Sequence, residues 1–590
     1  MKSPRASGQR RHSNVRFSKQ SAGLVAVGLI SAMALTACGG SDDGGGDSES
    51  GATGTGTVVF GESTDFPENL YQFISAGNAT SVQNIMGRIL PSTYNVAPDF
   101  SVAWDENVLA SEPTLSTDGG TQVNTYEINP DAVWSDGTPI TADDFAFTWN
   151  ANRSADPADG GCESVLSTNG YANIASVEGS GDGNKTVTVT YAEPYADWQS
   201  LFTGMIPAHL MANEDPVAQC ATTTAGWPID QGIVGDISGG PFQLKKENID
   251  VGNQEVTLTP NPEWWGEPAG VASLVVKNIG NDPTTAVQAL QNQEIGVIYP
   301  QPQLDLVSQI ENLEPNVTSD ITFGLSFEHL DFNTTDVHLA DPLVRQAFGQ
   351  ALDRQEIVDQ TVGQFSDDAQ VLNNRLYVNN QPEYQDNAPE QYKQADPEGA
   401  KALLTQAGYT IGADGIATHP QRGPLNIQID TTANNPLRET TITVMIPQLK
   451  AAGINATFSA NPDIFADVDK PRSLVAGGFQ AALFAWVSTP FVSSNQSIYY
   501  SPDNGLGQNY SRTGTPEIDA LLAQMVSQPD PAQAADLANQ VDVALWEQLA
   551  TIPLYQKPTF IAYQSSIQNV EDNASQAGPL WNAEKWTVAE

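Results

Sequence analysis

The sequence predicts a protein of the α/β class that is divided into two or three domains. At 590 residues the chain is too long for one ordinary hydrophobic core. Residues 186–191 alternate between polar and apolar side chains, which is typical of a half-buried strand. Residues 343–352 carry apolar side chains at helical spacing, which is typical of a helix with one buried face. Both kinds of signal recur along the chain.

The first 37 residues have the composition of a secretory signal. They carry six basic residues and no acidic one, followed by an apolar run over 22–37 that is too short for a comfortable membrane span. Its exit, residues 35–38, resembles the bacterial lipobox. This resemblance predicts lipidation of Cys38 and an extracytoplasmic protein that the acyl chains anchor to the cell membrane. The alternative is an ordinary signal that ends near a cysteine by chance.

Composition limits what the mature chain binds. Residues 38–56, rich in Gly, Ser, Asp and Thr, are predicted to form a flexible tether. The whole chain has 25 basic and 70 acidic residues, a formal net charge of −45. Nucleic-acid binding needs clustered basic residues to replace counterions, so we expect no nucleic-acid partner. The acidic excess indicates a well-solvated surface outside the cell rather than a dedicated cation site.

Two cysteines remain after the predicted signal, Cys162 and Cys220. In an oxidising extracytoplasmic space an even pair indicates a disulfide more often than a metal site. The two residues flank a predicted hairpin region, so they could meet. No Cys-x-x-Cys spacing occurs, and we predict no metal site.

Local signals place further strands and helices along the chain. Asp282 followed by Pro283 is typical of a capped helix start. The expected elements are a strand at 57–61, a helix at 85–90, a strand at 255–259, helices that begin at 283, 342 and 397, the last ending at Gly408, and a buried strand within 477–486.

Residues 126–149 predict a packed strand, turn and helix. Asp136-Gly137 provides the turn, because glycine adopts backbone angles that other residues resist. Thr141 is expected to cap the helix, with Asp144 at the capping-box position. These local features indicate a scaffold without chemistry of its own.

Residues 134–145, Trp-Ser-Asp-Gly-Thr-Pro-Ile-Thr-Ala-Asp-Asp-Phe, closely resemble the signature of the family 5 solute-binding proteins of ABC importers, of the actinobacterial type. Further blocks at 238–242, 261–265 and 552–555 are similar to that family. The resemblance implies a periplasmic-binding-protein-like class II (cluster C) fold, α/β throughout, with two hinged lobes and an extra small α/β domain. The implied parts are a discontinuous domain I (57–104, 235–325 and 550–590), domain II (105–234) and domain III (326–549).

The same resemblance implies a function. The protein is expected to capture a peptide-like or other small polar solute, such as an oligopeptide, a sugar-bearing compound or a metal chelate. It would deliver that solute to an ABC permease with its ATPase subunits, as a monomer that contacts the membrane only through its lipid. We expect no cofactor and no catalytic residues, because neither a His-Glu-x-x-His nor a Gly-x-Ser-x-Gly motif occurs. An extracellular enzyme is the third functional hypothesis, after solute capture for transport and a glycolipid-pathway role.

The family resemblance also places candidate ligand-binding residues. Trp486 would end a strand and open a loop that lines the cleft, with plain core packing as the alternative. In peptide-binding relatives an Asp stands three residues after that Trp and pairs with the peptide amino terminus. Thr489 stands there in this chain, and a neutral hydroxyl cannot supply that charge-assisted bond.

Other candidates follow from the same resemblance. The polar residues Ser488, Asn495 and Tyr499 suit a polyhydroxylated or amide-bearing solute, with a polar surface loop as the alternative. His329 and Asp331 lie on a strand that the family presents to the cleft. For His329 we expect a cleft-wall residue with satisfied hydrogen bonds rather than a nickel or haem ligand.

A second, looser resemblance points away from transport. Residues 195–209 and 264–266 are similar to mycobacterial lipoproteins of this fold that act in mannosylated glycolipid synthesis. The alternative function is therefore a glycolipid-binding or regulatory lipoprotein that does not import a solute.

Overall fold

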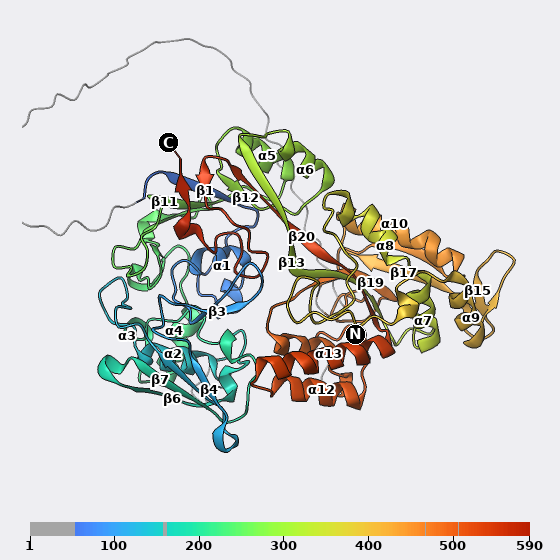
Figure 1. Cartoon of the computed structure of the whole chain (residues 1–590), viewed down its shortest axis with the longest axis horizontal. Helices are drawn as coiled ribbons and strands as arrows, with labels where there is room; N and C mark the ends of the chain where they lie inside the picture. Colours follow the sequence, from blue (N-terminus) through green and yellow to red (C-terminus); the bar gives the residue numbers. More distant parts are fainter. Residues whose placement is uncertain (1–53, 157–161, 467, 505–506, 590) are drawn as a thin grey trace, which may run out of the picture. The chain divides into compact units, whose positions relative to one another are not determined.

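A central sheet of eleven strands organises the protein (Figure 1). The computed structural model describes residues 54–156, 162–466, 468–504 and 507–589. The predicted signal and Cys38 lie outside these residues. Across the sheet the strands are β18 (Asn455–Ala460), β17 (Asn426–Thr431), β19 (Ala481–Val487), β13 (Val317–Phe332), β20 (Thr551–Gln564), β12 (Val297–Ile298), β1 (Thr57–Glu62), β11 (Ser273–Asn278), β10 (Glu255–Pro260) and β8 (Phe242–Gln243), with β9 (Ile249–Asp250) paired to β10.

Two long antiparallel strands, β13 and β20, run through the middle of this sheet (Figure 1). The first half of β13 pairs with the part of β20 that also contacts β12, and the second half pairs with β19. Their register shifts between Phe323 and Phe327 and again between Glu328 and His329. Such irregularities bend and twist a strand pair. The two halves of the sheet therefore share β13 and β20, and the register between these two strands shifts midway along them.

Helices bury the two halves of the sheet separately. Beside β12, Leu290, Leu306 and Phe560 belong to one apolar cluster. Beside β17 and β19, Phe348 and Met445 belong to a larger one. The helices described are α1 (Thr80–Met86), α2 (Ala142–Asn152), α3 (Ala208–Met211), α4 (Pro216–Ala225), α5 (Pro283–Gln291), α6 (Leu304–Glu311), α7 (Pro342–Ala351), α8 (Arg354–Gln360), α9 (Pro397–Gln406), α10 (Pro436–Ala451), α11 (Gln496–Tyr499), α12 (Pro516–Val526) and α13 (Pro531–Gln548).

A separate antiparallel sheet forms within residues 105–234. Its strand order is β4 (Thr114–Ser116), β5 (Val123–Glu127), β7 (Thr186–Tyr191) and β6 (Ile174–Ser180). Helix α2 begins after Thr141, which forms the predicted capping box with Asp144. Tyr126 and Phe145 pack with ring centroids 5.6 Å apart, so the predicted strand, turn and helix are confirmed.

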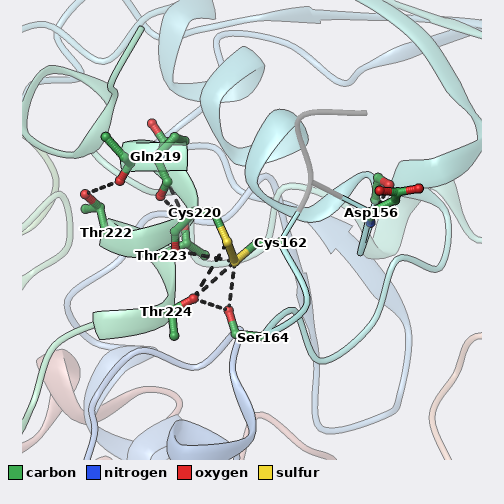
Figure 2. Close-up of a disulfide and its surroundings, with 10 residues drawn as sticks. Asp156, Cys162, Ser164, Gln219, Cys220, Thr222, Thr223 and Thr224 are labelled. Carbon is green, nitrogen blue, oxygen red and sulfur yellow. Dashed lines mark hydrogen bonds between the residues drawn. A yellow bond between two sulfur atoms is a disulfide. The ribbon is translucent and has the colours of Figure 1, made fainter. Parts of the chain in front are cut away.

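A disulfide joins Cys162 to Cys220 on α4 (Figure 2). Thr224, one turn further along α4, lies with its hydroxyl 3.1 Å from the Cys162 sulfur and 3.0 Å from the Ser164 hydroxyl. The bridge ties the segment before β6 to this helix.

Two sequence-based boundaries were wrong. The helix expected at 85–90 instead ends at Met86, and Gly87 is its C-cap. The strand expected within 477–486 begins only at Ala481. Gly477 has a positive φ of 77°, and a Cβ on Gly478 would lie 1.7 Å from the Pro471 carbonyl oxygen, so a turn precedes the strand. The remaining small sheets are β2 (Tyr94–Val96) with β3 (Val102–Trp104), β14 (Thr410–Ile411) with β15 (Ala417–His419) and β16 (Gly423–Pro424), and β21 (Ile567–Gln568) with β22 (Thr587–Val588).

Candidate functional site

The sequence-selected residues of β13 and β19 lie on one face of the central sheet. Successive side chains of a strand point to opposite faces, so Phe327, His329 and Asp331 share a face. The register places Phe327 opposite Trp486 and His329 opposite Phe484. The first of these pairs lies at the register shift of the long strands.

Trp486 is the centre of an aromatic cluster, defined here as His329, Phe484, Trp486 and Tyr510. Its ring is partly exposed and lies nearly parallel to those of His329 and Tyr510, with centroids 5.7 Å away on each. Phe484 meets the His329 ring edge-on at 4.2 Å. The next residue, Val487, is 67% exposed, so the strand leaves the core directly after the cluster. Trp486 thus belongs to the packed cluster and also reaches the surface.

His329 differs from its expected role. The side chain is fully buried, and neither ring nitrogen has a hydrogen-bond partner within the described residues. The nearest carboxylate oxygen, on Asp331, is 3.6 Å from Nε2, beyond a normal hydrogen bond. The described residues therefore do not supply the hydrogen bonds expected for His329. A buried polar group without a partner costs about 1–3 kcal/mol.

Asp331 and Tyr499 meet at a small enclosed cavity. Its volume is about 20 Å³, enough for one water molecule, and Arg375 and Tyr510 also line it. The Asp331 carboxylate accepts a hydrogen bond from the Thr551 hydroxyl at 2.6 Å. The Tyr499 hydroxyl is buried without a partner among the described residues, and burial raises the pKa of Tyr499.

The other three candidates lie in the following loop and bond to neighbouring backbone. The Ser488 N–H donates to the Leu325 carbonyl at 3.3 Å. The Thr489 hydroxyl accepts from the Phe491 N–H at 3.2 Å, and the Asn495 amide donates to a carbonyl three residues back. The structure therefore gathers His329, Asp331, Trp486 and Tyr499, and no side-chain hydrogen bond among the described residues joins Thr489 or Asn495 to them.

Sequence reasoning missed two features of this region. Tyr510 has no local signature, because only folding brings it onto Trp486. The Tyr195 to Asp197 segment, which follows β7 of the small sheet, contacts the loop after Trp486. The Asp197 carboxylate accepts the Ser493 N–H at 2.6 Å, and burial raises the pKa of Asp197.

Two further searches cover only the described part of the chain. No group of three or more His, Cys, Asp or Glu side chains there is arranged to hold a metal ion. No helix there combines the length and apolar character needed to cross a bilayer.

The fold is that of a class II periplasmic binding protein. The periplasmic EDTA-binding protein EppA superposes with a TM-score of 0.80 and 27% identity, covering 92% of this chain and 98% of that one. The oligopeptide-binding protein AppA from Bacillus subtilis, solved with a nonapeptide, gives a TM-score of 0.66 and 21% identity over 91% of this chain and 100% of that one. These similarities confirm the predicted α/β class and the predicted class II binding-protein fold.

The chain belongs to the bacterial extracellular solute-binding proteins, family 5, whose middle part matches residues 106–508. The oligopeptide-binding protein OppA of Mycobacterium tuberculosis is 30% identical over 515 residues, 86% of this chain and 81% of that protein. The probable monoacyl phosphatidylinositol tetramannoside-binding protein LpqW of the same organism is 24% identical over 600 residues, 88% of this chain and 89% of that protein. Family 5 proteins are extracytoplasmic, bind small solutes and work with ABC permeases.

Proposed function

We propose that this protein captures a peptide-like or other small polar solute outside the cytoplasm and delivers it to an ABC import permease, anchored through lipidated Cys38. The observation that carries the proposal is the position of Trp486. It pairs with Phe327, where the register of the two long shared strands shifts. We take this register shift as the candidate hinge, so a solute that contacts the Trp486 ring would touch both an aromatic wall and the hinge. Solute binding would then favour a closed form, which a permease can distinguish from the open one.

The chemistry of the site favours a peptide-like solute bound without an ammonium clamp. Thr489 offers no carboxylate, and its hydroxyl is engaged in a local turn. Asp331 is a buried carboxylate beside His329, which disfavours a polyanionic chelate. The 30% identity to an oligopeptide-binding protein supports the same solute class. We expect contacts through aromatic stacking and through the peptide backbone.

The test is native mass spectrometry of the full protein, extracted from its own membranes without refolding, with fragmentation of the molecule that co-elutes. A released peptide supports the proposal. A mannosylated lipid would instead support the alternative, to which the 24% identical relative LpqW also points. If the protein is recovered without a bound ligand, it is titrated with tri- to pentapeptides. If it binds none of them, the peptide assignment is overturned.

Two variants locate the bound solute. Trp486→Ala removes the aromatic wall and should weaken solute binding by about tenfold or more, as expected for a central aromatic contact. Phe458→Ala removes an exposed aromatic residue of the edge strand β18 and should leave affinity unchanged. Peptide uptake by cells that carry each variant tests delivery. Equal uptake with both variants would rule out a role for Trp486.

A further inference from the structure

A second cavity, with a volume of about 560 Å³, shares no lining residue with the aromatic cluster. Its walls come from four stretches of chain that are far apart in sequence, within 87–108, 239–241, 264–270 and 577–587. Cavities of this size are typical of small-molecule sites. Three of its lining residues are tryptophans, Trp104, Trp264 and Trp581, so we call it the tryptophan cavity.

The tryptophan rings are partly exposed, and two of them are fixed in place. The Trp264 N–H donates to the Glu267 carbonyl and the Trp581 N–H to the Glu571 carbonyl, both at 3.1 Å. Trp264 also packs against Trp265, with ring centroids 4.6 Å apart. Since the two N–H groups are already bonded, these rings offer a ligand their apolar faces and edges.

Hydrogen-bonding groups stand beside these rings. The Asp105 carboxylate is held by the side-chain amides of Asn95 at 2.9 Å and Asn107 at 3.1 Å. Glu106 and Glu267 are exposed, and their carboxylates form no hydrogen bond or ion pair within the described chain. The cavity therefore combines oriented acceptors and amide donors with fixed aromatic surfaces.

The charges around the cavity disfavour an anionic ligand. Four carboxylates line it, which disfavours an anion. Two cations line it as well: Arg88 lies 3.3 Å from the Glu584 carboxylate, and the Lys585 ammonium lies 5.7 Å from the Trp581 ring centre. Both cations are thus already engaged within the protein and are not free to hold an anion. A neutral ligand with one apolar face and many hydroxyl groups avoids the repulsion that an anion would meet, and it can donate hydrogen bonds to the carboxylates.

We propose that the tryptophan cavity binds a neutral, pyranose-containing glycan. The C–H face of the sugar ring would stack on Trp264 or Trp581, and its hydroxyl groups would donate to Asp105 and Glu106. This site goes beyond the proposed capture of an imported solute, because it lies on other residues. Either a free oligosaccharide or a glycan fixed to the cell surface presents this chemistry.

The experiment measures binding to the full protein by saturation-transfer NMR and calorimetry. The probes are free mono- to tetrasaccharides of glucose, galactose and mannose, insoluble cell-wall glycan, and vesicles that carry a glycosylated lipid. Binding of the free sugars identifies a soluble ligand, whereas sedimentation with the wall glycan or vesicles alone identifies a surface-fixed one. The proposal is overturned if the protein binds none of these probes.

Variants connect binding to the cavity. Trp264→Ala should weaken glycan affinity by about tenfold or more, and Glu106→Gln, an exposed change that is safe for folding, by several-fold. Phe458→Ala should leave affinity unchanged. Glycan binding that neither cavity variant reduces would place the ligand elsewhere and contradict the proposal. Failure of peptide capture at Trp486 would leave this prediction standing, because the two sites share no residue.

Discussion

The carboxylate of Asp197 accepts the backbone N–H of Ser493 at 2.6 Å, across 296 positions of the chain. The Tyr195 hydroxyl lies 3.2 Å from the Ser493 hydroxyl, and the Ala196 N–H donates to the Val526 carbonyl at 3.0 Å. Asp197 is only 6% exposed. The loop that follows Trp486 is thus held by the segment that follows β7, so its position depends on contacts outside its own sequence.

Removing the Asp197 carboxylate should loosen this loop. Asp197→Ala leaves the Ser493 N–H without its acceptor, which costs about 1–3 kcal/mol for a buried group. We expect faster hydrogen exchange of the 491–497 backbone, measured by mass spectrometry on the full protein. Asp197→Asn keeps an acceptor oxygen and should retain most of the protection. Unchanged exchange in Asp197→Ala would show that other contacts hold the loop.

The same carboxyl gives the contact a pH dependence. Burial raises the pKa of Asp197 above its ordinary value of 3.8, so the folded state binds this proton more tightly than the unfolded state. The bound proton therefore stabilises the folded state fully at pH values below the ordinary pKa, and this stabilisation is lost as pH rises through the raised pKa of Asp197. Thermal stability of the wild type relative to Asp197→Asn should decline as pH rises from 4 to 7. A constant difference would contradict the raised pKa. Asp144 and Asp572, whose pKa values burial also raises, remain in both proteins and cancel.

Features encoded by neighbouring residues could be predicted from the sequence. Asp282, Asp341 and Asp396 each cap a helix that begins with proline, because the cap and the helix start are adjacent in the chain. The contacts of the candidate site could not be predicted in this way. Tyr510 reaches Trp486 only through folding, and so do the aromatic rings that surround His329.

The resemblance to a family also had limits at the site. It placed Trp486 correctly at the end of a strand, but it could not show that the Thr489 hydroxyl accepts a hydrogen bond within a local turn. A family signature records scaffold positions, whereas hydrogen bonds in a loop depend on the individual residues present.

The disulfide should stabilise the region around the small four-stranded sheet. It closes a loop between positions 58 apart, and such crosslinks typically contribute about 2–4 kcal/mol by limiting the unfolded chain. Replacing Cys162 and Cys220 together by serine should lower the thermal transition of the protein and speed proteolysis of this region. Reduction of the wild type should reproduce the effect and should not change the double variant. Equal proteolysis rates for the oxidised wild type and the double variant would show that the bridge adds no stability.

A buried ion pair supports the floor of the candidate site. The Arg375 guanidinium lies 3.0 Å from the Asp542 carboxylate, and both side chains are fully buried. Arg375 also donates two hydrogen bonds to the Thr551 carbonyl, at 3.1 and 2.7 Å. The Thr551 hydroxyl in turn donates to Asp331. The pair therefore joins α13 to β20 directly beside the small cavity.

Removing one partner of this ion pair should lower the free energy of unfolding far more than replacing both partners. Arg375→Met leaves a buried carboxylate without compensation, which typically costs about 3–5 kcal/mol, and the pKa of Asp542, which burial already raises, should rise further. Asp542→Leu alone leaves the guanidinium uncompensated. The double variant removes both charges and should recover much of the loss, short of the hydrogen bonds to Thr551. Urea unfolding, followed by tryptophan fluorescence, gives the free energy of unfolding of all three variants. Trp546 reports on this region because its ring centre lies 4.1 Å from the Arg375 guanidinium. Losses that simply add in the double variant would show that the two charges are not coupled.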